Sequence, residues 1–172
     1  MEHQILDLRT DPTLLPCGRS DHPSLIQGAR DTAINDLREL FRKDLLRAKI
    51  LVNPQGNPCG VIFYSLVENS LYNLTGEGIL HLLCLEVRES ERLQRFGEKL
   101  IHAAINDYPA SIVQGISTFS YGEYWMPKSY FKKLGFRVTH QEGLLTLQFR
   151  PLVKNISPPS LLKVKIPPYE DP

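Results

Sequence analysis

Cysteine is scarce in this chain, and its spacing argues against two common uses of the residue. Only Cys17, Cys59 and Cys84 occur among the 172 residues. They are an odd number, lie far apart and form no C-x-x-C pair, so neither a disulfide framework nor a zinc-binding cysteine motif is predicted. We therefore expect a reducing, cytoplasmic compartment and no bound metal.

Long apolar runs and an excess of charge of one sign are also lacking. No stretch reaches the roughly 20 apolar residues that a membrane-spanning helix needs, and the start, MEHQILDLRTDP, lacks the basic and then apolar pattern of a signal peptide. The net charge is only +1, so there is no electrostatic basis for binding nucleic acid. Neither a membrane nor a nucleic-acid partner is expected.

What the chain does have is a regular succession of apolar patterns, in a length that suits one domain. Strand patterns are predicted at residues 4–8, 49–53, 61–67, 78–87, 111–119, 136–140 and 144–149, and helical periodicity at residues 24–47, 96–107 and 126–134. The run at 78–87 is almost continuously apolar, as expected for a central strand that is covered on both faces. The order of elements indicates an α/β fold with a sheet of mixed direction.

The C-terminal end differs from the rest in composition. Six of the thirteen prolines fall within residues 151–172, so an extended tail is expected here in place of a helix. Leu162, Val164 and Ile166 alternate with lysines, which suits an edge strand or a segment that crosses to a partner subunit, and leaves a homodimer open. We therefore divide the chain into a domain of residues 1–150 and a Pro-rich extension of residues 151–172.

The strongest chemical signal lies where the central strand meets the next helix, in the stretch VRESERLQRFGEKLI from Val87 to Ile101. The first turn of a helix has unpaired backbone N–H groups, and its dipole favours an anion. Arg92 and Arg95 add fork-shaped donors that suit phosphate, and Gly97 lets the backbone approach a pyrophosphate closely. The alternative is that these charged residues form only the solvated face of an amphipathic helix.

Two motifs in this part of the chain resemble the GNAT N-acetyltransferase superfamily. Its phosphate loop has Val, then Arg or Gln five residues later, followed by x-x-Gly-x-Gly/Ala; here Val87, Arg92 and Gly97 match, whereas Arg95 replaces the first glycine. The family often carries Phe-Tyr-x-x-x-Gly-Phe downstream, and residues 130–136 are YFKKLGF, with the two aromatics exchanged. The resemblance covers about residues 3–150 and implies a mixed, mostly antiparallel central sheet flanked by helices.

The resemblance implies direct transfer of an acetyl or other acyl group from acetyl-CoA to a primary amine, with no metal. The acceptor is a small-molecule or peptide amine whose identity the sequence does not contain. The pantetheine arm is expected to pair with the backbone of β-strand residues, and the pyrophosphate to bind the loop. The implied cofactor-binding residues are Leu85, Val87, Arg92, Leu93, Gln94, Arg95, Phe96, Gly97 and Glu98.

His81 is the residue that we predict to be the general base. It stands six residues before Val87, where histone-acetylating relatives carry a catalytic glutamate, and an imidazole accepts a proton near neutral pH. The alternative is a hydrogen-bonded histidine in a buried strand. Glu86 is expected on the opposite face of the strand by alternation, so it would be the base only if a β-bulge re-aimed it.

The proton donor is where the chain departs most from the family. The tyrosine that protonates the leaving thiolate in many members aligns with Phe131, so we assign this role to Tyr130 or Tyr124. The alternatives are the hydroxyl of Tyr121 or Ser129, or a thiolate that departs without a dedicated acid. The second interpretation is a CoA-binding regulatory or interaction module without turnover. The aromatic residues of 119–125 suit either an acceptor pocket for a cationic amine or a small apolar cluster of a structured loop.

Overall fold

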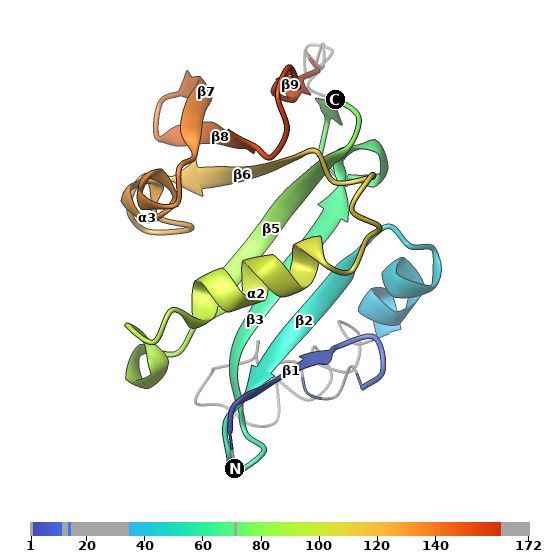
Figure 1. Cartoon of the computed structure of the whole chain (residues 1–172), viewed down its shortest axis with the longest axis vertical. Coiled ribbons are helices and arrows are strands. Elements are labelled where there is room, and N and C mark those ends of the chain that lie inside the picture. Colours follow the sequence, from blue (N-terminus) through green and yellow to red (C-terminus); the bar gives the residue numbers. More distant parts are fainter. Residues whose placement is uncertain (1, 12–13, 15–34, 71, 163–172) are drawn as a thin grey trace, which may run out of the picture.

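The computed structural model describes residues 2–11, 14, 35–70 and 72–162, which form one large sheet with helices packed against it (Figure 1). Seven strands lie in the order β1-β2-β3-β5-β6-β8-β7. Their bounds are Gln4–Asp7 (β1), Arg47–Val52 (β2), Pro58–Leu66 (β3), Ile79–Val87 (β5), Gly115–Tyr121 (β6), Arg137–Glu142 (β7) and Leu145–Pro151 (β8). All neighbouring pairs are antiparallel except β5 and β6, which are parallel. The predicted mixed, mostly antiparallel sheet is confirmed.

The other elements are short, apart from one helix. They are α2 (Phe96–Ile105), α3 (Lys128–Lys133), the helical turns η2 (Val67–Asn69) and η3 (Glu89–Glu91), and the two-stranded sheet of β4 (Leu74–Thr75) and β9 (Ser160–Leu161). Residues 35–42 form a further helix. No helix within the described residues is long and apolar enough to cross a membrane.

Helices cover both faces of the sheet because each has one apolar stripe. Phe96, Leu100 and Ala104 of α2 are buried against one face, in a core that also contains Phe131 of α3. The spacing of these α2 residues is that of a helix with one apolar side. The opposite face near β2 and β3 packs against the helix of residues 35–42. β5 is buried from Ile79 to Leu82, whereas the rest of the strand is half-buried or exposed.

β5 and β6 are paired along only part of their length. Their register runs from Ile79 opposite Gly115 to Leu82 opposite Thr118, and no pairing follows although β5 continues to Val87. Beyond Leu82 the two strands diverge, as Figure 1 shows. One edge of β5 is therefore left without a neighbouring strand at the centre of the sheet.

A β-bulge in β5 changes which side chains share a face. Along β3, Phe63 lies opposite Cys84 whereas the next residue, Tyr64, lies opposite Leu82, so Leu83 is an extra residue in the ladder. An extra residue shifts the alternation by one. Glu86 consequently lies on the same face as His81, and the expectation from simple alternation that the two lie on opposite faces is wrong.

Several predicted boundaries also need correction. The helix predicted for residues 24–47 ends at residue 42, because Asp44 takes a left-handed φ of 54° that breaks it; residues 24–34 lie outside the described part. The strand predicted from residue 111 begins at Gly115, since the preceding residues form a turn in which the N–H of Ile112 donates to the carbonyl of Pro109.

The Pro-rich extension contributes one short strand to the described structure. β9 pairs with β4, Leu161 opposite Leu74, and so forms an edge beside the main sheet. Residues 163–172, which include two positions of the predicted alternation, lie outside the described residues. The division of the chain at residue 150 stays a prediction.

Candidate functional site

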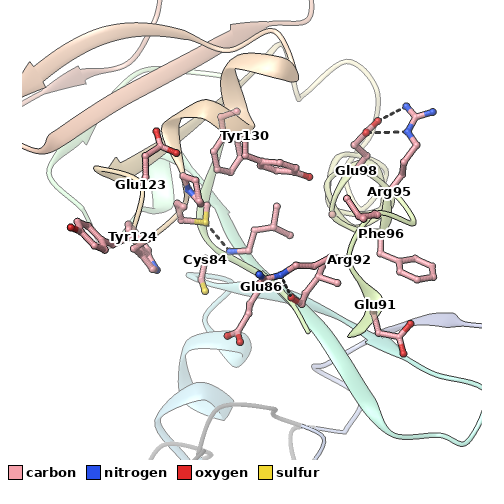
Figure 2. A pocket seen from close by; sticks show the side chains of 18 residues that line it. Cys84, Glu86, Glu91, Arg92, Arg95, Phe96, Glu98, Glu123, Tyr124 and Tyr130 are labelled. Atoms are coloured by element: carbon pink, nitrogen blue, oxygen red, sulfur yellow. Dashed lines mark hydrogen bonds and ion pairs between the residues drawn. The ribbon is translucent and has the colours of Figure 1, made fainter. Parts of the chain in front are cut away.

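A cavity of about 930 Å³ opens where β5 and β6 diverge (Figure 2). Its walls come from the end of β5, the loop before α2, the first turn of α2, the loop of residues 123–127 and the start of α3. Ten of the twelve residues predicted to be catalytic or cofactor-binding line it: Leu85, Val87, Arg92, Leu93, Arg95, Phe96, Gly97, Glu98, Tyr124 and Tyr130. Gln94 and His81 do not.

The loop at one end of the cavity has backbone donors without acceptors. Within the described part of the chain, the N–H groups of residues 93–98 donate no hydrogen bond, whereas that of Arg92 donates to Glu89 and that of Lys99 to Arg95. Consecutive unpaired N–H groups at a helix start form an anion-binding surface. This geometry favours phosphate binding over a merely solvated helix face.

Two residues of this loop have a left-handed backbone without being glycine. Leu93 has a φ of 71° and Arg95, which directly precedes α2, a φ of 58°. Left-handed backbone is unfavourable for residues with a side chain. Arg95 thus adopts at the start of α2 a backbone conformation that glycine adopts without strain. Such strain is often found at ligand sites.

The arginine side chains bind partners within the loop itself. The Arg92 Nε donates to the Val87 carbonyl over 3.4 Å, and the Arg95 Nε donates to Glu98 over 3.0 Å. Arg95 and Glu98 form their pair at the rim of the cavity (Figure 2). An incoming phosphate therefore competes with Glu98 for Arg95. The cavity is also lined by more carboxylates than guanidinium groups, so the backbone donors are its main attraction for an anion.

The free edge of β5 presents backbone groups to the cavity. The N–H of Leu85 donates to the sulfur of Met126 over 3.0 Å, and the carbonyl of Val87 accepts a long contact from the Arg92 side chain. A thioether is a weak acceptor. These are the groups expected to pair with a pantetheine arm, and a ligand amide offers them better partners than the present ones.

Tyr130 and Phe131 have exchanged places relative to the family motif, with a clear structural result. Phe131 is 1% exposed and lies in the core, whereas the half-buried Tyr130 directs its hydroxyl into the cavity (Figure 2). Burial, with a contribution from Glu98, raises the pKa of Tyr130. The phenol therefore stays protonated at neutral pH and can donate a proton within the cavity.

Tyr124 lies at the rim of the cavity and is 89% exposed. Its neighbour Glu123 holds the loop against α3, because its carboxylate accepts bonds from the N–H and the hydroxyl of Ser129, at 3.1 and 2.6 Å. The loop thus presents Tyr124 and Trp125, also exposed, at the cavity mouth. Tyr124 is placed to contact an acceptor more readily than to protonate a buried thiolate.

His81 is not where the predicted general base has to be. It is fully buried, its Nδ1 lies 2.9 Å from the Ser117 hydroxyl, and the rings of Tyr72 and Phe119 pack edge-on against it. Burial lowers the pKa of His81 to about 3. A histidine that stays neutral and has no contact with the cavity is a poor proton acceptor at neutral pH, so its position conflicts with the assigned role.

Glu86 lies on the same face of β5 as His81, whereas strict alternation along the sequence predicts the opposite face. The bulge turns it to the face opposite α2, where it is exposed and lines the cavity. Among the described residues its carboxylate has no hydrogen-bond or ion-pair partner, unlike those of Glu98 and Glu123 in the same cavity. Nothing in the sequence pattern marks the bulge. The sequence therefore supports only a conditional statement, that Glu86 can be the base if a bulge turns its side chain to the other face.

Gly97 is expected to tolerate no side chain because of Tyr130. A Cβ at Gly97 would overlap the Tyr130 hydroxyl oxygen and lie 3.3 Å from the ring carbon Cζ. We expect Gly97→Ala to cost about 1–2 kcal/mol of unfolding free energy, although alanine is the better helix former. Urea unfolding measures this loss. Tyr130→Phe in the same chain is expected to restore part of it, with Tyr130→Phe alone as control; equal stability of Gly97→Ala and parent would contradict the prediction.

No protein-family model matches the sequence, and no curated protein matches it either. Solved structures do share its fold. The PaiA N-acetyltransferase from Thermoplasma acidophilum, in complex with coenzyme A, has a TM-score of 0.63 and 13% identity over 88% of this chain and 99% of that one. An acetyltransferase from Thermus thermophilus has a TM-score of 0.60 and 19% identity, over 88% and 98% of the two chains. A GNAT family N-acetyltransferase from Escherichia coli in complex with CoA has 0.58 and 12%, over 92% and 88%.

Proposed function

We propose, on the premise that the chain has the GNAT fold, that it is an N-acyltransferase which moves an acetyl group from acetyl-CoA directly to a primary amine. The observation that carries the proposal is the run of unpaired N–H groups in residues 93–98, at the end of a cavity between two diverging strands. Coenzyme A is present in two of the similar structures. A cytoplasmic location and an amine of low molecular weight or on a peptide belong to the same proposal.

The residues present fit coenzyme A as the acyl carrier. The N–H groups of residues 93–98 are donors for its pyrophosphate, with Arg92 and Arg95 as added charge. Leu85 and Val87 offer the backbone pairing for its amide groups once Met126 releases the Leu85 N–H. The thioester supplies an activated acyl group; what this chain adds is its position and the handling of protons.

The two faces of β5 separate the two proton transfers. On the face opposite α2, the Glu86 carboxylate accepts the proton of an ammonium acceptor, so that the free amine can attack the acyl carbon. On the α2 side, the Tyr130 hydroxyl gives its proton to the sulfur that leaves as the new C–N bond forms and the C–S bond breaks. The amide nitrogen releases its extra proton at the same stage, and solvent returns a proton to Tyr130. A backbone N–H on the free edge of β5 that the pantetheine arm leaves unused stabilises the charge on the acyl oxygen.

A cationic amine is the acceptor class that the cavity mouth favours. Tyr124 and Trp125 present exposed aromatic rings there, and Glu86 and Glu123 add negative charge. Aromatic faces and carboxylates both attract ammonium groups. The exposed rings can also contact a neutral amine. The acceptor screen should therefore compare amines that differ in charge.

The second candidate is a module of the same fold that binds coenzyme A without turning it over. One observation favours it: the position of the family's tyrosine is occupied by Phe131, which is buried in the core and has no hydroxyl. Tyr130 answers this objection only if its hydroxyl reaches the leaving sulfur. Binding alone therefore cannot separate the two candidates, whereas release of free thiol can.

Calorimetric titration with acetyl-CoA, followed by an assay of free thiol with a panel of mono- and polyamines, tests both candidates. Micromolar binding that exceeds the binding of adenosine 3′,5′-bisphosphate, together with amine-dependent thiol release, is the expected result. Binding without thiol release for any amine would favour the module. A folded sample that binds neither acetyl-CoA nor the bisphosphate would overturn both.

A further inference from the structure

Three side chains of the kinds that bind metal ions meet beside η3, just before the loop of residues 92–95. They are His3, which precedes β1, Cys59 in β3 and Glu91 in η3. Their ligand atoms all lie within 4.8 Å of one another, and His3 Nε2 is 3.0 Å from a Glu91 carboxylate oxygen. The three are widely separated in sequence, so a search for close cysteine spacing does not find them.

We propose that His3, Cys59 and Glu91 form a binding site for a divalent cation of the zinc type. An imidazole nitrogen, a thiolate and a carboxylate are its usual ligands, at bond lengths of about 2.0–2.3 Å. With these bond lengths, two ligand atoms of a tetrahedral site lie about 3.3–3.7 Å apart. The two ligand atoms of this cluster that lie farthest apart therefore have to approach each other by about 1 Å when the ion binds. The fourth position is left for water.

The surrounding structure holds the three ligands in place. The ring of His3 packs on Phe96 with 4.4 Å between ring centres, which restricts its orientation. Cys59 is 2% exposed, and its carbonyl accepts the N–H of Arg88 over 2.8 Å, which fixes this end of β3 to the end of β5. The side chains of His3 and Glu91 retain 20% and 17% exposure, so an ion can reach them from solvent.

A cation here would link three elements that otherwise meet through few bonds. β1 and β3 belong to the rigid sheet, whereas η3 leads directly into the loop with unpaired N–H groups. The ion would therefore stabilise the chain as a whole and the start of that loop in particular. The competing interpretation is a His3–Glu91 hydrogen bond beside a buried, unreactive thiol.

Cobalt(II) titration distinguishes the two, because a cobalt–thiolate bond has its own near-ultraviolet absorption. The full chain is stripped of metal in a Cys17→Ser, Cys84→Ser background, where Cys59 is the only thiol. We expect a charge-transfer band that saturates at one cobalt per chain and disappears when zinc displaces it. His3→Gln and Glu91→Gln should each weaken cobalt binding at least tenfold, and Cys59→Ser should abolish the band.

Matched controls lie in the same region of the chain. Glu89→Gln changes another carboxylate of η3, and His102→Gln changes an exposed histidine of α2; both should bind cobalt like the parent. Zinc should raise the melting temperature of the parent and of the two control variants, but not that of the three variants that lack a ligand. Absence of a stoichiometric band, or a band that is unchanged in His3→Gln and Glu91→Gln, would overturn the site. His3 and Glu91 are partly exposed, so their substitution is expected to leave the fold intact. These two variants therefore test the site even if Cys59→Ser fails to fold.

Discussion

Glu86→Gln is expected to lower kcat for amine acetylation about 10²- to 10⁴-fold, which is the usual contribution of a general base. Glutamine keeps the size of the side chain but cannot take up the proton of an ammonium acceptor. Because Glu86 lies on the face opposite α2 and is not one of the residues proposed to hold the pyrophosphate, the affinity for acetyl-CoA should stay within about twofold of the parent. Steady-state kinetics with a saturating amine, and calorimetry for the cofactor, measure the two quantities.

Two matched variants make the Glu86 prediction specific. Glu89→Gln removes an exposed carboxylate that does not line the cavity and should leave kcat unchanged. His81→Gln tests the base that the sequence favoured; since His81 is buried and its pKa is lowered to about 3, we expect a stability loss with an unchanged pH profile of kcat. If Glu86→Gln turns over like the parent while His81→Gln alters the pH profile, the general base is His81.

The contrast between His81 and Glu86 shows what a sequence can predict about a site and what it cannot. The nearly continuous apolar run at residues 78–87 identifies a central strand, because strands in the middle of a sheet are apolar along most of their length. Which face a side chain occupies depends on strict alternation, and one extra residue at Leu83 reverses it from there on. A bulge depends on register with β3, which is a property of two strands together.

The turn that leads from β5 into α2 was predictable because its sequence signal is local, and its binding of phosphate stays a prediction. Consecutive residues between a strand and a helix supply the donors, so Arg92 and Gly97 could be named from one short motif. The left-handed backbone of Arg95 could not be predicted from the sequence. A residue with a side chain adopts a φ of 58° only when the surrounding fold compensates for the strain. The cluster of His3, Cys59 and Glu91 lies at the other extreme, because only the folded sheet brings its members together.

The largest effect on stability is expected at Asp107, which follows the C-terminal end of α2. Its carboxylate accepts hydrogen bonds from Lys49 and Tyr64, and forms ion pairs with Arg9 and Arg47 at 3.2 and 3.3 Å. The Asp107 side chain is 13% exposed. One carboxylate therefore joins β2, β3, the second residue after β1 and the end of α2.

Asp107→Asn should lower the free energy of unfolding by about 3 kcal/mol at neutral pH. Removal of one partner from a largely buried ion pair leaves uncompensated charge, which typically costs about 3–5 kcal/mol, and the residual exposure of this site reduces that figure. Asp44→Asn is the matched control, since Asp44 also pairs with Arg47 but its side chain is 50% exposed; an exposed pair is worth about 0–1 kcal/mol. Urea unfolding of the two variants should separate them clearly.

The same carboxylate predicts how stability depends on pH. Burial acts to raise the pKa of Asp107, but hydrogen bonds from Lys49 and Tyr64 outweigh it and hold the pKa below its ordinary value; Asp7, bonded to Arg9 and Lys49, is lowered as well. A depressed carboxyl pKa in the folded state stabilises the protein above the unfolded value of about 3.9, and this contribution is lost as the pH falls through the folded pKa. The parent should therefore lose stability steeply below about pH 4, whereas Asp107→Asn should lose less, so that the gap between them narrows. A gap that stays constant from about pH 7 to about pH 3 would mean that Asp107 contributes nothing through its charge.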